Sequence, residues 1–108
     1  QYMGKLVYKV TDAELSNTQA KDFILVVFGL TEHSVVYDPR LLSISTDQPN
    51  ILKFSFKAVQ VTNKQSESIK KRVVASAITI SPKKLINIDK ILIESESGVF
   101  ELNLKAKS

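Results

Sequence analysis

The sequence predicts an all-β fold, an antiparallel β-sandwich of seven to eight short strands. Apolar residues recur mostly with a period of two, as on strands that bury one face. Turn residues separate these runs at roughly the 8–12-residue spacing that is typical of sandwiches. No segment carries a convincing helical stripe. We therefore expect residues 1–108 to form a single sandwich domain, cut from a larger protein.

The chain begins with an alternating strand and a polar loop. Leu6, Tyr8 and Val10 alternate with polar residues, apart from Val7, and we interpret residues 15–21 (LSNTQAK) as a polar loop. The next run, Asp22–Leu30, is almost continuously apolar. Such a run predicts a central strand that is buried on both faces.

The next two segments predict a bent edge strand and a long alternating strand. Residues 34–45 form either two short strands or one strand bent at Asp38-Pro39, because proline belongs at a sheet edge or a bulge. Residues 50–58 alternate cleanly, and the phase then slips after Ala58. The slip indicates a bulge or a crossing between sheets.

The last part of the chain predicts three further strands. A β-branched strand ends at Ser81-Pro82, and Ser81 is suited to cap one helical turn. The segment 85–95 is a strand with one residue inserted near Asp89-Lys90. Ser97-Gly98 makes a turn, so the last two strands form a hairpin.

The alternation also predicts the core. The predicted core residues are Leu6, Tyr8, Val10, Phe23, Leu25, Val27, Leu52, Phe54, Phe56, Ile78, Ile80, Ile91, Ile93, Phe100, Leu102 and Leu104.

Composition excludes several kinds of site. The chain has no cysteine, so it has neither disulfides nor a thiol nucleophile, and this suits a reducing, cytoplasmic location. His33 is the only histidine, and the three glycines form no phosphate-binding loop. The acidic residues are scattered. We expect no catalytic residues, no metal and no cofactor.

The net charge of +4 is mild, but it is concentrated in one cluster, Lys64–Arg72. Lys64, Lys70, Lys71 and Arg72 are candidate contacts for a protein partner or for anionic lipid headgroups. The alternative is that they are solvated charges that protect the apolar strand after them from aggregation. Nucleic acid is not expected as a partner, because the aromatic residues alternate as core residues and not among the basic ones.

Several segments resemble the C2 domain. "KLVYKVTDAELSNTQAKDFILVVF" resembles the opening of that family, with Ala13, Leu15 and Asp22 at matching positions. "TDQPNILKFSF", "VVASAITISPKKL" and "GVFELNLK" resemble later strands. The resemblance implies an eight-stranded sandwich that docks onto lipid or protein and is not an enzyme.

The departures from the C2 pattern argue against calcium binding. Calcium takes about 6–8 oxygen ligands, usually with several carboxylates. Only Asp22 matches in the first loop, and the second loop should lie where the basic cluster is. A second family, the PLAT sandwich, is similar in "VVFGL", "NIDKILIE" and "GVFELNL", but its usual tryptophans are absent.

We therefore expect a calcium-independent, C2-like module in the cytoplasm that docks its parent onto a protein partner or scaffold. An alternative is attachment to an anionic membrane, or to a membrane-associated or cytoskeletal structure, through Lys64–Arg72. Val35, Val36 and Tyr37 are the candidate residues for edge-strand pairing with a partner. The oligomeric state is left open.

Overall fold

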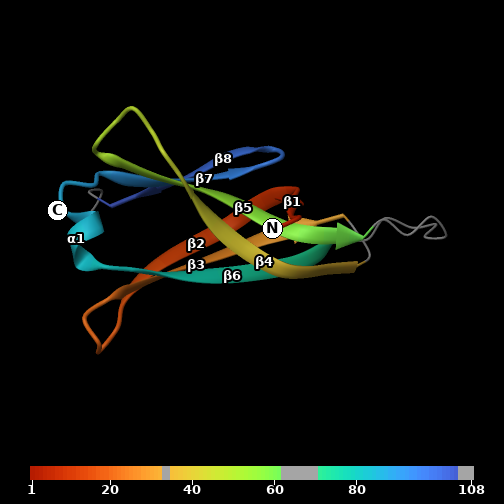
Figure 1. Cartoon of the computed structure of the whole chain (residues 1–108), viewed down its shortest axis with the longest axis horizontal. Helices are drawn as coiled ribbons and strands as arrows, with labels where there is room; N and C mark the ends of the chain where they lie inside the picture. Colours follow the sequence, from red (N-terminus) through yellow and green to blue (C-terminus); the bar gives the residue numbers. More distant parts are fainter. Residues whose placement is uncertain (33–34, 62–70, 105–108) are drawn as a thin grey trace.

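Strand β5 is the centre of the larger of two sheets in the computed structural model, which describes residues 1–32, 35–61 and 71–104 (Figure 1). The larger sheet has five strands: β1 (Lys5–Leu6), β4 (Val35–Ile44), β5 (Ile51–Val61), β7 (Lys90–Ser95) and β8 (Gly98–Asn103). One side of β5 pairs with β4. The other side pairs first with β7 and then with β1, and β8 pairs with β7.

The smaller sheet has three strands, in the order β2-β3-β6: β2 (Lys9–Asn17), β3 (Phe23–Thr31) and β6 (Arg72–Ile80). The short helix α1 (Pro82–Leu85) follows β6 and leads the chain across to β7 in the other sheet. Pro82 at the start of α1 suits a first helical turn, since proline has no N–H to satisfy there. Ser81 is the N-cap as predicted, although its side chain makes no capping bond.

The predicted all-β sandwich is confirmed, with eight strands in the described residues. The β7–β8 hairpin is confirmed, and β4 is one strand bent by a bulge between Tyr37 and Arg40. A bulge was also expected after Ala58 of β5. The register shift is there, but the extra residue is on β4, where Asp38 and Pro39 lie opposite Ala58. One pair differs from the antiparallel expectation: β5 and β7 run parallel, because the connection through α1 brings the chain back in the same direction.

Three expectations about the strands were wrong. The first strand is not continuous, because the chain crosses between sheets at Val7 and Tyr8. Residues 15–17 belong to β2, so the polar loop shrinks to the turn at residues 18–22. The segment before β7 is no strand: Ile86 is 65% exposed, and β7 begins only at Lys90.

The core lies between the two sheets. The buried centre includes eight predicted residues: Val10, Leu25, Val27, Phe54, Phe56, Ile80, Ile91 and Ile93. The other predicted residues pack half-buried against it, except Leu6 and Tyr8, which lie outside the cluster at the crossing. Val7 is fully buried instead, and its N–H donates to the carbonyl of Phe56 at 3.0 Å.

Candidate functional site

The outer face of the three-stranded sheet carries a strip of apolar side chains. Along β3, buried residues alternate with half-buried ones, so only one face of the strand packs into the core. The prediction that this strand is buried on both faces was therefore wrong. The outward side chains form three cross-strand pairs with β6: Val26 with Ala77, Phe28 with Ala75, and Leu30 with Val73. We call these six residues the outer strip.

The outer strip is accessible for contact. Val73 is 73% exposed, Ala75 and Ala77 are exposed, and the three residues of β3 are half-buried. The two alanines have short side chains, so nothing on the β6 side of the strip stands between an approaching surface and the larger Phe28. Contiguous apolar residues on a surface commonly mark an interaction site.

Charged residues of β2 border the outer strip. Lys9 lies opposite Leu30, Asp12 opposite Phe28, and Glu14 opposite Val26. Residues directly opposite one another in an antiparallel pair project from the same face. All three are exposed, and the Asp12 carboxylate accepts a hydrogen bond from the N–H of Ala13 at 2.9 Å. The strip therefore has an acidic border beside Phe28 and Val26.

The basic cluster ends next to the outer strip. Lys71 and Arg72 are exposed and lead directly into Val73. The Lys71 Nζ lies over the ring of Tyr8, 5.5 Å from its centroid, which holds one of these cations against the protein surface. Lys64 and Lys70 lie outside the described residues.

The predicted pairing segment lies on the outermost strand β4, but a fixed bulge interrupts that strand. Val35 and Tyr37 are 47% and 54% exposed, whereas Val36 packs against the core. The bulge follows at once, and Asp38 there has a positive φ of 52°. Bulges and proline are the means by which sheet edges resist pairing. Edge pairing through Val35, Val36 and Tyr37 stays a prediction.

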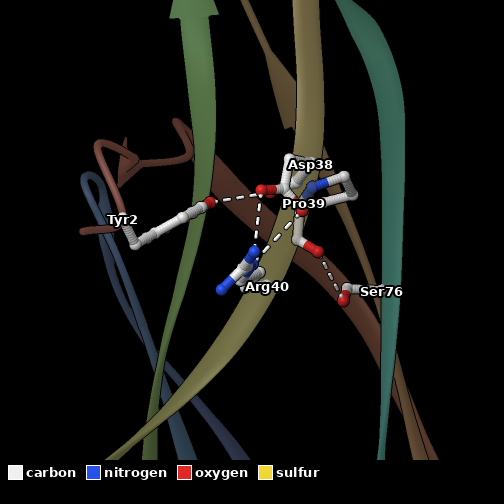
Figure 2. Close-up of polar contacts among 5 residues, drawn as sticks. All are labelled: Tyr2, Asp38, Pro39, Arg40 and Ser76. Carbon is white, nitrogen blue, oxygen red and sulfur yellow. Dashed lines mark hydrogen bonds and ion pairs between the residues drawn. The ribbon is translucent and has the colours of Figure 1, made fainter.

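Polar contacts from three directions hold the bulge in place (Figure 2). The Tyr2 hydroxyl donates to the Asp38 carbonyl at 2.7 Å, and the Ser76 hydroxyl of β6 donates to the Pro39 carbonyl at 3.0 Å. Arg40 pairs with the Asp38 carboxylate at 3.1 Å and lies over the Tyr2 ring, 4.6 Å from its centroid. Partial burial, followed by the nearby Asp38 charge, raises the pKa of Tyr2, and Arg40 opposes this shift.

The Ser76 contact should contribute measurably to stability. Ser76→Ala is expected to lower the free energy of unfolding by about 1 kcal/mol, since it removes one hydrogen bond that joins the two sheets. Urea unfolding measures the loss. Ser43→Ala, at an exposed serine of β4, is the control and should change stability by less than about 0.5 kcal/mol. Equal losses would show that the Ser76 contact does not fasten β4 to β6.

The polar segment between β2 and β3 is a tight hairpin turn. The Thr18 N–H donates to the Asp22 carbonyl at 2.9 Å, and the Lys21 N–H donates to the Thr18 carbonyl at 3.1 Å. Lys21 has a φ of 78°, and the Thr18 hydroxyl accepts from the Ala20 N–H. In residues 1–32, 35–61 and 71–104, no three His, Cys, Asp or Glu side chains lie together in a way that suits a metal ion. His33 lies outside these ranges.

Comparison with known proteins gives no relative. No family model matches the chain, and no curated protein and no solved structure matches it significantly. Among the described residues, no helix is long and apolar enough to cross a membrane.

The sequence contained a signal for the outer strip that the period-two analysis did not use. The even-numbered residues of β3 and the odd-numbered residues of β6 are all apolar or small on one face. A continuous apolar run is equally consistent with a strand buried by its own domain and with one whose outer face is left for a partner. Only the packing of the two sheets separates these cases.

Proposed function

We propose that this chain is a non-catalytic docking module that attaches its parent protein to another protein through the outer strip. The observation that carries the proposal is the apolar face formed by β3 and β6, with Phe28 at its centre. The resemblance to C2 domains supports the same role, in a form that does not depend on calcium. Docking through an apolar face gains free energy because the face is removed from water.

The border of the outer strip indicates the chemistry of the partner. Asp12 and Glu14 lie beside the apolar centre, so the partner surface should be apolar in its middle and carry lysine or arginine opposite these two carboxylates. Complementary charges at a rim guide association and fix its orientation. The same two carboxylates repel an anionic membrane, which is why we favour a protein partner.

The basic residues beside the outer strip favour the membrane alternative. Lys71 and Arg72 stand next to the most exposed residue of the strip, Val73. A basic pair beside an apolar side chain is a common way to contact anionic lipid, but stable attachment usually needs two signals. Phosphatidylserine vesicles at low and at high salt test this alternative, each with calcium and with chelator.

Phe28→Lys is expected to weaken binding to the partner at least tenfold, because the lysine puts a charge in the apolar centre. A photoreactive amino acid at Ala75 first cross-links the partner, and the identified partner is then purified and titrated. Ile86→Lys is the control, since Ile86 is 65% exposed and lies in neither the outer strip nor any other proposed contact surface, and it should leave the affinity unchanged.

Two results would contradict the proposal. One is equal loss of affinity in Phe28→Lys and Ile86→Lys. The other is salt-sensitive binding of the wild-type chain to phosphatidylserine vesicles that disappears in Lys71→Ala/Arg72→Ala, which would establish the membrane alternative.

A further inference from the structure

A second surface lies where the two sheets meet edge to edge, between β2 and β8. Each of these strands is outermost in its own sheet. In Figure 1 the two strands diverge toward the end of the sandwich where α1 lies. A hollow of about 520 Å³ lies between them there, lined by Ala13–Ser16 of β2 and by residues 102–104 at the end of β8 and just after it. We call it the β2–β8 seam.

Within the described residues, backbone hydrogen bonds join the two sides of the seam at its narrow end. There the N–H groups of Glu96 and Ser97 donate to the carbonyls of Val7 and Tyr8, at 2.8 and 2.9 Å. Beyond this point, no backbone hydrogen bond joins β2 to β8 among the described residues. Both strands therefore present backbone edges along the hollow.

The hydrogen bonds at the strand ends show which backbone groups face the seam. The bond from Thr18 to Asp22 directs alternate residues of β2 toward β3, so Leu15 faces the seam with its N–H and carbonyl. In the same way, the bond from the Leu104 N–H to the Asp89 carbonyl, at 2.8 Å, turns the backbone groups of Val99 and Glu101 away from β7. Glu101 lies next to the hollow in sequence, and Val99 lies nearer its narrow end. Ala13 also faces it, but its N–H is already bonded to Asp12.

The side chains along the seam have an apolar floor and an acidic border. Leu15, Leu102 and Leu104 are half-buried and pack against the core. Glu14 is exposed on the border and forms no ion pair within the described residues, while Glu101 pairs with Lys90 at 3.0 Å. An occupant therefore meets leucine side chains below, backbone hydrogen-bonding groups at both sides, and a carboxylate above.

We propose that the β2–β8 seam binds an extended segment of another protein in which apolar residues alternate with lysine or arginine. An extended segment pairs its backbone with a sheet edge, and alternate side chains point to opposite sides. The apolar ones lie on Leu15 and Leu102, and the basic ones face Glu14. This proposal shares Glu14 with the border of the outer strip, but its apolar and backbone contacts come from other residues, so the two proposals can fail separately.

The other side of the sandwich is less suited to such an occupant. There β4 lies beside β6, and the Ser76 hydroxyl bonds directly to the Pro39 carbonyl on the edge of β4. The bulge at Asp38 further interrupts the edge. A strand is therefore expected to add at the seam rather than at Val35–Tyr37.

The test uses an eight-residue peptide of alternating valine and lysine, acetylated and amidated, titrated into the ¹⁵N-labelled chain. A peptide of the same composition with all lysines contiguous is the control. We expect the alternating peptide to slow amide hydrogen exchange at Leu15 and Glu101 at least tenfold, and the control peptide to leave both unchanged. Shifts confined to Phe28 and its neighbours on the outer strip would overturn the proposal, as would no binding at millimolar peptide.

A proline substitution separates edge pairing from charge attraction. Glu101→Pro removes the N–H that faces the seam and should weaken peptide binding at least tenfold. Glu101→Ala loses the same carboxylate but keeps the N–H, so it should bind within about twofold of wild type. Val99→Pro repeats the test at an exposed side chain if Glu101→Pro does not fold. Equal affinity of the folded proline variant and Glu101→Ala would overturn the proposal.

Discussion

Phe56→Ala is expected to lower the free energy of unfolding by about 3–5 kcal/mol, the usual loss for a fully buried phenylalanine. Phe56 is 0% exposed and is the largest fully buried side chain in the described core. It projects from the central strand β5 toward the other sheet, where its ring approaches Gly29 of β3. The deletion leaves a cavity between the sheets, because both are held by their own ladders and cannot close over it.

This loss is a large part of the total stability, since a domain of this size has about 5–15 kcal/mol in all. The variant should therefore unfold at a much lower urea concentration. Phe28→Ala provides the matched control, because it removes the same atoms from the outer face of β3. Its expected loss is about 1 kcal/mol, as the side chain is only half-buried.

The comparison of the two phenylalanines also bears on the proposed function. A small loss at Phe28 means that the outer strip is not required for folding, which leaves a partner as the reason for an aromatic side chain there. Similar losses in the two variants would mean that Phe28 is a structural residue, and they would remove the main support for docking through the strip.

The core was predictable because, on a strand that buries one face, the inward apolar residues alternate with outward polar ones. Phe54 and Phe56 on β5 and Ile91 and Ile93 on β7 were found in this way, and all are buried. The signal is local, so it needs no knowledge of which strands pair.

Sheet membership was not predictable from alternation. The chain changes sheets at Val7 and Tyr8 without glycine or proline, so no turn residue marks the crossing. The parallel pairing of β5 with β7 joins residues far apart in sequence, and neither strand's pattern specifies its neighbour. The seam depends on this topology, because it exists only where β2 and β8 are both outermost.

Gly29→Ala is expected to destabilise the fold by about 2–3 kcal/mol, near the upper end for overpacking in a core. A Cβ at this position would lie 2.6 Å from the Lys9 carbonyl oxygen and 3.0 Å from Cε2 of Phe56. The nearer obstacle is backbone, so it cannot move aside as a side chain can. Gly98→Ala is a comparison of a different kind: a Cβ there meets nothing within 4 Å, so any loss of stability reports the strain of the positive φ of 147° and not a clash.

A double variant identifies which contact dominates. If the Lys9 carbonyl is the main obstacle, Phe56→Leu should not rescue Gly29→Ala, and the two losses in urea unfolding should add. Partial rescue would assign the clash to the Phe56 ring instead. The distinction matters for the outer face, because Gly29 lies opposite Val10, where β2 bulges before Asp12. If β2 has to move away from an added methyl group, Asp12 shifts with it, and Gly29→Ala should then also weaken partner binding through the outer strip.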